Sequence, residues 1–341
     1  MKYLDRKGDI EEIAKIPSIN ILNNLADIAP KFCFIVPTYK RADLLQYALD
    51  SILGQETDEK FEILVVDDNP ERKDETELLM ISRYNMPGIT YYKNSKNHRQ
   101  EGNWNKLFFL SRTEWIIMLH DDDMLYPNYM KYLLKTMNFY SKNIGGFFPS
   151  FVGYEFSNDI LPDRKKLDIH ARVIKKFDFL RGCILGAPLG MCVRRDLVLE
   201  LGGVNKYSGV AVDYDFFNRL CKVTDVVKMY DYPLGVWRVM DNVSQRKETV
   251  QFCVEWGDVL KMETLEDCGL KWFTPIYISY VRAFDRQHIE NWFKSMGKGK
   301  PEEGDLKQCS KVDKFFYKVF VAFFAFCRRI RLRNRTIKIE G

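Results

Sequence analysis

The sequence predicts an α/β fold with a mostly parallel central sheet flanked by helices and a helical C-terminal extension. Short apolar runs alternate with helix-like segments between residues 32 and 119. The runs are continuous rather than alternating, which favours parallel strands buried on both faces. The chain has 341 residues, 46% of them hydrophobic, so it can bury a large core.

The expected elements follow in a regular order. The expected strands are 32–36 (FCFIV), 61–66 (FEILVV), 89–92 (ITYY) and 115–119 (WIIML). The helix-like segments are 43–53, with Asp43 as N-cap, 75–83 and 102–111. Beyond Pro127 we expect a helix over 128–138, a strand over 145–153, a helix from Val212, and mostly helical chain over 249–293.

Composition excludes several classes of protein. The net charge is only +5, and 14% aromatic residues are incompatible with a disordered chain. The eight cysteines occur singly without a CxxC pair, which indicates reduced thiols in the cytoplasm and no structural zinc. We expect no secretory signal at the N-terminus, and no apolar run reaches the ~20 residues of a membrane-spanning helix.

Polar residues follow three of the expected strands: "PTYKR" from Pro37, "DDNP" from Asp67 and "HDDD" from His120. Ligand sites of open α/β sheets lie beyond the carboxyl ends of the strands. We therefore expect these three segments to converge on one crevice.

The run Asp121, Asp122 and Asp123 supplies oxygen ligands of the kind that Mg²⁺ and Mn²⁺ prefer. A cation would relieve the repulsion between adjacent carboxylates. The alternative is an acidic turn in which Asp121 or Asp123 caps the helix after Pro127. His98 and His120 are further potential ligands, but they lack the HxH or HExxH spacing of a zinc site.

Nucleotide contacts are expected around the first two strand ends. Asp67 or Asp68 would accept hydrogen bonds from a ribose hydroxyl or a base N–H, and the loop after the first strand would hold a base or ribose edge. Ordinary turn chemistry explains both segments as well. In "NHRQEGNWN", residues 97–105, Asn97 and Asn103 would contact ribose or phosphate, with helix capping as the alternative.

Asp213 is the candidate general base. Transfer of a group to a hydroxyl needs a carboxylate that takes the acceptor's proton. The alternative is that Asp213 and Asp215 are first-turn acids that suit the dipole of a helix.

Six motifs together resemble the family 2 glycosyltransferases of GT-A fold, whose sheet is Rossmann-like. In order they are IVPTYKR, ILVVDDNP, NHRQEGNWN, MLHDDDMLYP, MCVRRDLVLELGGVN and VDYDFFNRL, and they span about residues 31–244. The resemblance implies inverting transfer of a sugar from a nucleotide diphosphate, with a divalent metal on the diphosphate.

The resemblance also implies residue roles. Asp213 falls where the family has its catalytic base, and Asp122 and Asp123 are the expected metal ligands because His120 stands at the motif's first Asp. Val212 replaces a usual Glu, and Met240 replaces a His that often follows Arg238. The expected nucleotide-binding residues are Pro37, Thr38, Tyr39, Arg41, Asp67, Asp68, Asn97, Asn103, Asp121 and Arg238.

The expected domain organisation has five parts. They are an N-terminal helical lead-in (1–30), a GT-A domain (31–245) with a nucleotide-binding half (31–127) and an acceptor half (128–245), a helical region (246–296), a linker (297–311) and an amphipathic basic segment (312–341). The last is rich in Phe and then in Arg, a pattern typical of a helix lying on an anionic membrane. The alternative is a helix packed on the domain or in a dimer contact.

The expected protein is a metal-dependent hexosyltransferase at the inner face of the cell membrane. Its donor would be a UDP-sugar, its cofactor Mg²⁺ or Mn²⁺, and its acceptor a saccharide or polyprenyl-diphosphate-linked oligosaccharide of bacterial surface-polysaccharide synthesis; no nucleic acid partner is expected. One alternative, a sugar-phosphate nucleotidylyltransferase, needs a Gly-rich loop after the first strand, and "PTYKRADLL" has no glycine. The other is a non-catalytic membrane scaffold.

Overall fold

The computed structural model describes residues 7–140, 143–154, 169–239, 246–295, 301, 306, 308–335 and 337–339. The chain forms two compact units. Unit 1 comprises Met1–Ile174, Leu185–Met240 and Ile337–Gly341, and unit 2 comprises Lys175–Ile184 and Asp241–Thr336. Met240 and most of the expected linker, 297–311, lie outside the described residues.

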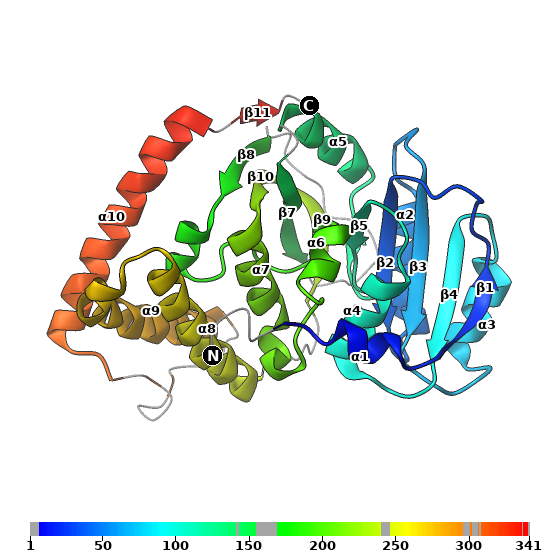
Figure 1. Cartoon of the computed structure of the whole chain (residues 1–341), viewed down its shortest axis with the longest axis horizontal. Helices are drawn as coiled ribbons and strands as arrows, with labels where there is room; N and C mark the ends of the chain where they lie inside the picture. Colours follow the sequence, from blue (N-terminus) through cyan, green and yellow to red (C-terminus); the bar gives the residue numbers. More distant parts are fainter. Residues whose placement is uncertain are drawn as a thin grey trace. The chain divides into compact units, whose positions relative to one another are not determined.

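One mixed sheet runs through unit 1, in the order β1-β4-β3-β2-β5-β9-β7-β10-β8-β11, with β6 paired to β10 (Figure 1). Strands β2 to β5 are parallel neighbours and have almost entirely buried side chains, as their apolar sequences predict. The strands are β1 Ser18–Asn23, β2 Phe32–Thr38, β3 Phe61–Asp67, β4 Ile89–Asn94, β5 Trp115–Met118, β6 Met124–Leu125, β7 Ile144–Tyr154, β8 Ile169–Ile174, β9 Cys192–Arg194, β10 Asp225–Arg238 and β11 Ile337–Ile339.

The α/β fold class is confirmed, but the sheet is mixed rather than mostly parallel. Beyond β5 only β7 and β10 pair in parallel, while β9 runs antiparallel to both β5 and β7, and β8 runs antiparallel to β10. A parallel neighbour needs a crossover of about a dozen residues, usually a helix. The parallel neighbours β7 and β10 are joined through β8, the 3₁₀ turn η2 (Lys176–Arg181), β9 and the helices between β9 and β10, and not through a single helix, so they do not form a regular βαβ unit.

The helices α2 Ala42–Leu53, α3 Glu75–Arg83, α4 Arg99–Leu110, α5 Tyr129–Phe139 and α7 Val212–Val223 lie close to their predicted bounds. Unit 1 also contains α1 Ile10–Ala14, α6 Arg195–Glu200 and the 3₁₀ segment η3 Lys206–Ala211, whose bounds were not predicted from the sequence. Asp43 was wrongly predicted as N-cap. Arg41 occupies that position, and Asp43 lies in the first turn of α2, where an acid still suits the helix dipole.

The N-terminal lead-in is not wholly helical. After the five-residue helix α1, β1 pairs antiparallel with β4 and extends the sheet. Sequence periodicity does not reveal an edge strand that gains its hydrogen bonds from a distant partner. Lys106 of α4 fixes the entry to β1, since its Nζ donates to the carbonyl oxygens of Ile13 (2.9 Å) and Ile16 (2.5 Å).

Unit 2 contains the helices α8 Lys247–Asp267, α9 Thr274–Ser295 and α10 Lys311–Arg335, and the 3₁₀ turn η5 Lys271–Phe273. The predicted helical region is thus two helices, separated at Gly269, whose φ of 73° no other residue adopts as easily. Leu265, Tyr277, Tyr280, Phe320 and Phe324 form part of its apolar core. Among the described residues, no helix is long and apolar enough to cross a membrane.

Candidate active site

The ends of β2 and β5 converge, as the sequence predicts. The hydroxyl of Thr38, the last residue of β2, donates to Asp121 Oδ2 over 2.8 Å. Arg41, in the same loop, contacts Asp122 Oδ2 at 2.7 Å and Asp121 Oδ1 at 3.4 Å through its Nη1. The loop after the first strand and the acidic run after β5 therefore form one site.

Arg238 joins this site from β10. Its backbone N–H donates to Asp123 Oδ1 over 3.2 Å, and its side-chain Nε donates to the carbonyl oxygen of Asp122, also over 3.2 Å. The guanidinium lies over the ring of Tyr47, 5.5 Å from its centroid. Arg238 is thus held beside the acidic loop.

The acidic run does not cap α5. That helix has Asn128 at its N-cap without a side-chain cap, whereas Asp121 and Asp123 are bound to residues of β2, its loop and β10. Burial, followed by the charge of Asp122, raises the pKa of Asp121 to about 6, and burial also raises the pKa of Asp123. These buried carboxylates are therefore poised to be stabilised by a cation.

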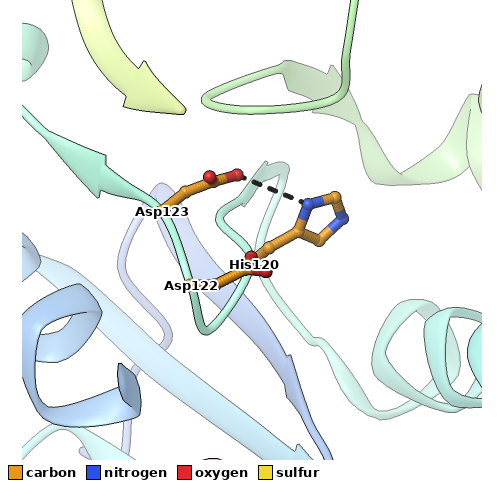
Figure 2. Close-up of side chains that lie close together, drawn as sticks. All are labelled: His120, Asp122 and Asp123. Carbon is orange, nitrogen blue, oxygen red and sulfur yellow. Dashed lines mark ion pairs between the residues drawn. The ribbon is translucent and has the colours of Figure 1, made fainter. Parts of the chain in front are cut away.

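His120, which the sequence offered as a further potential ligand outside the expected metal pair, lies beside that pair. Its ring is turned toward Asp123, with Nδ1 3.5 Å from Asp123 Oδ2 (Figure 2). One donor atom each from His120, Asp122 and Asp123 lies within 4.8 Å of the others. Burial alone would lower the pKa of His120, but Asp123, Asp122 and Asp121 outweigh it and raise the pKa.

Trp104 of α4 fixes the imidazole of His120. The two rings stack with centroids 5.4 Å apart and an interplanar angle of 26°. Standard zinc spacings could not reveal this residue, because the cluster comes from a tight turn in which the Asp123 N–H donates to the His120 carbonyl. The available signal was the place of His120 in the acidic motif, because the family that the sequence resembles has an Asp at that place.

Asp67 lies in the wall of the site and is not accessible to a ligand. Its fully buried carboxylate accepts hydrogen bonds from Lys93 Nζ (2.7 Å), Tyr91 Oη (2.8 Å) and the backbone N–H of Asn69 (2.9 Å). Lys93 also contacts Asp74 Oδ1 at 2.9 Å. This placement assigns Asp67 a structural role in place of the predicted nucleoside contact.

Asp68 connects β3 to the start of α4. Its carboxylate accepts hydrogen bonds from the backbone N–H of His98 and from the side chain of Asn94, and burial raises its pKa to about 6. Asn103 is also buried, between Asn94 and the Val66 carbonyl. Asn97 instead is exposed and accepts from the Arg99 N–H.

Two further predicted contacts differ in exposure. Pro37 is partly buried near the end of β2, whereas Tyr39 is 45% exposed, with the Nζ of Lys40 5.7 Å from its ring centroid. An exposed aromatic ring after β2 is available to stack on a flat ligand.

Asp213 lies in the first turn of α7 and is partly exposed. Burial raises the pKa of its carboxyl to about 6, while the N–H of Tyr214 and the charge of His120 act in the opposite direction. Two residues on, buried Asp215 accepts from Arg219 Nε over 2.8 Å. Arg219 also donates to the carbonyl oxygens of Leu201 and Gly203, which anchors α7 to the preceding turn.

The close approach at Gly203 explains the paired glycines of that turn. Gly203 has a φ of 73°, and a Cβ there would lie 2.1 Å from Asn105 Oδ1. Asn105 of α4 binds both the N–H and the carbonyl of Val204. The turn before η3 therefore needs glycine, and through it α4 and α7 are held together.

Comparison with known proteins bears on this site. Residues 33–186, which contain β2 to β5 and the acidic loop, match the model of glycosyl transferase family 2. This match supports a family 2 glycosyltransferase. An uncharacterized glycosyltransferase of Haemophilus influenzae is 25% identical over 190 residues, which make up 54% of this chain and 60% of the relative.

Solved structures show the same fold as this transferase. S. aureus TarS 1-349 in complex with UDP-GlcNAc superposes with a TM-score of 0.52 at 13% identity, over 79% of this chain and 92% of TarS. The mannosyltransferase PcManGT of Pyrobaculum calidifontis, in complex with GDP-Man and Mn²⁺, gives a TM-score of 0.51 at 13% identity, over 95% of this chain and 86% of PcManGT. The GT-A fold expected from the sequence is confirmed.

Proposed function

We propose that this transferase moves a sugar, with inversion, from a UDP-sugar to a hydroxyl of a lipid-linked or oligosaccharide acceptor in bacterial surface-polysaccharide synthesis. The observation that carries the proposal is the convergence of Thr38, Arg41 and Arg238 on the acidic loop. Cationic and hydroxyl side chains around paired carboxylates suit a diphosphate held together with a cation.

The nucleoside would lie along the ends of β2 and β3. Tyr39 offers an exposed ring for stacking, Pro37 and Thr38 border it, and Asp68 is the acceptor proposed for a base or ribose donor. Arg41 and Arg238 would bind the diphosphate oxygens. Asn103 supports this wall from behind, and Asn97 remains a peripheral candidate in the exposed loop.

Asp213 is proposed as the general base. Its carboxylate would accept the proton of the acceptor hydroxyl as that oxygen bonds to the anomeric carbon, while the bond from this carbon to the diphosphate oxygen breaks on the opposite face. Attack from the opposite face inverts the configuration. The raised pKa of about 6 keeps Asp213 ionised at neutral pH but makes it a stronger base than an ordinary aspartate.

Asp122 and Asp123 are the proposed metal ligands, and their carboxylates fit a divalent cation because both lie in one turn with donor atoms close together. Mg²⁺ or Mn²⁺ bound there would stabilise the negative charge that develops on the leaving diphosphate. The Mn²⁺ in the complex of PcManGT supports this assignment. Asp121 is held by Thr38 and would orient the loop.

The C-terminal helix is the proposed site of membrane association. On α10 an exposed apolar stripe recurs every three or four residues: Val312 (59% exposed), Phe315 (62%), Val319 (46%), Phe323 (47%) and Phe326 (62%). Lys311 and Lys318 are exposed along the same helix, and Arg328 and Arg329 follow the stripe within α10. An apolar face flanked by cations suits an anionic bilayer, which supports a lipid-linked acceptor and a location at the inner face of the membrane.

The catalytic proposal is tested with a panel of nucleotide sugars, a polyprenyl-diphosphate saccharide and Mn²⁺ or Mg²⁺. We expect release of UDP from one donor and an inverted anomeric configuration in the product by NMR. Binding of UDP without turnover of any donor would favour the scaffold. Release of pyrophosphate from a sugar phosphate and UTP would instead identify a nucleotidylyltransferase.

The membrane proposal is tested by flotation with anionic liposomes. Replacing Phe315 and Phe323 together with Ser should weaken binding about 100-fold, because each buried Phe contributes about 1.5 kcal/mol or more. Phe139→Ser is the matched control, since Phe139 is 58% exposed on α5. Unchanged liposome binding together with conversion of a dimer to a monomer would show that the stripe is a contact between copies.

A further inference from the structure

Resting on the proposed function, we propose that His120 is a ligand of the donor-site cation, so that the site offers one imidazole nitrogen and two carboxylates and prefers Mn²⁺ to Mg²⁺. His120 lies outside the pair of metal ligands expected from the sequence, Asp122 and Asp123. Its role as a ligand follows from the geometry of the turn from His120 to Asp123.

The separation of His120 and Asp123 suits a shared cation better than a direct hydrogen bond. Nδ1 and Oδ2 are 3.5 Å apart, whereas N–H···O bonds are about 2.7–3.2 Å long. Donor atoms up to about 4 Å apart can share one cation whose bonds to them are about 2.1 Å long. The donor atom of Asp122 belongs to the same group, in which all atoms lie within 4.8 Å.

The surroundings hold the imidazole ready for this role. Trp104 stacks on the ring, so the ring loses little further freedom when a cation binds. The other ring nitrogen, Nε2, is buried and has no hydrogen-bond partner among the described residues, so stacking on Trp104, and not a hydrogen bond at Nε2, orients the ring. A histidine placed only to pair with Asp123 would need neither the stacking nor the longer separation.

The donor set determines the metal. Mg²⁺ strongly prefers oxygen ligands, whereas first-row transition metals bind imidazole well. Replacing one carboxylate of an acidic motif by histidine therefore lowers the negative charge of the site and shifts its preference toward Mn²⁺. His98, on the neighbouring loop before α4, lies outside the cluster and is a matched control.

The experiment is pulsed EPR of the full chain with Mn²⁺ and UDP. We expect ¹⁴N modulation from a directly bound imidazole in the unaltered protein and in His98→Ala, and its loss in His120→Ala. The Mn²⁺ dissociation constant should rise about tenfold or more in His120→Ala, while competition by Mg²⁺ becomes stronger.

Two outcomes would overturn the proposal. Stoichiometric Mn²⁺ binding without ¹⁴N modulation would mean that the cation is held by carboxylates without an imidazole. Modulation that persists in His120→Ala would mean that another nitrogen gives the signal and that His120 is not the ligand. If instead neither the unaltered protein nor any variant binds Mn²⁺ with UDP, the metal-dependent function proposed above fails together with this inference. The first outcome leaves that function intact, so the two failures are distinguishable.

Discussion

Replacement of Lys93 by Met tests the structural role assigned to Asp67. The Lys93 ammonium is fully buried, 2.7 Å from Asp67 Oδ2 and 2.9 Å from Asp74 Oδ1. Met fills a similar volume but carries no charge. The variant therefore leaves the completely buried carboxylate of Asp67 without its cation. Asp74 also loses its contact with the Lys93 ammonium.

Breaking a buried ion pair from one side costs about 3–5 kcal/mol, because the remaining charge is uncompensated. Asp67 keeps its hydrogen bonds from Tyr91 and Asn69, so we expect the lower part of this range. The double variant Lys93→Met with Asp67→Asn should recover much of the loss, since the neutral amide can accept from the Asn69 N–H through its oxygen and donate to the Tyr91 hydroxyl oxygen through its NH2 group. The exposed pair of Arg83 and Asp50 (49% and 41% exposed) is the control, and Arg83→Met should cost less than about 1 kcal/mol.

The assay is urea unfolding followed by tryptophan fluorescence, together with UDP binding by calorimetry for each folded variant. Asp67→Asn should retain UDP affinity within about threefold, whereas Asp68→Asn should weaken it about tenfold, as expected for a lost charge-assisted hydrogen bond. A cost below about 1 kcal/mol for Lys93→Met, or a selective loss of UDP affinity in Asp67→Asn, would refute the assignment and restore Asp67 as a nucleoside contact.

The remaining predictions concern α7. Asp213→Asn should lower kcat about 10²–10⁴-fold while leaving UDP binding unchanged in calorimetry; wild-type turnover in this variant would remove Asp213 from the mechanism. Because a base must be ionised and the pKa of Asp213 is raised to about 6, kcat/KM of the unaltered enzyme should be constant above that pH and fall tenfold per unit below it; a profile flat down to pH 4.5 would contradict this. Arg219→Met should destabilise unit 1 by about 3–5 kcal/mol in urea unfolding, because buried Asp215 loses its cation and two carbonyl groups lose their donor; an unchanged midpoint would contradict the anchoring of α7.

The local sequence predicted the parallel half of the sheet and its helices. The run at β3 and the helix at Glu75–Arg83 agree with the structure because a strand buried on both faces needs continuous apolar residues, and a helix needs a cap and a periodic face. Asp74 caps that helix through the Glu77 N–H. These signals are encoded within a few residues, so no distant contact is needed to see them.

The antiparallel half and the edge strands were less predictable. β1 and β11 gain their hydrogen bonds from β4 and β8, which lie far away in the chain. Lys338, expected in the basic membrane segment, belongs to β11. Short strands of this kind have little intrinsic preference, and pairing with a remote partner decides their conformation.

At the site, the sequence by itself determined that carboxylates follow the strands, and its family resemblance predicted that the acidic run, Asp213 and Arg238 serve one reaction. Only the tertiary structure decided which of these groups face one another. It buried Asp67 against Lys93, bound Asp121 to Thr38, and turned His120 toward Asp123. A side chain's charge and donor atoms are properties of its residue type, but its partners and its exposure to a ligand depend on elements that folding brings together.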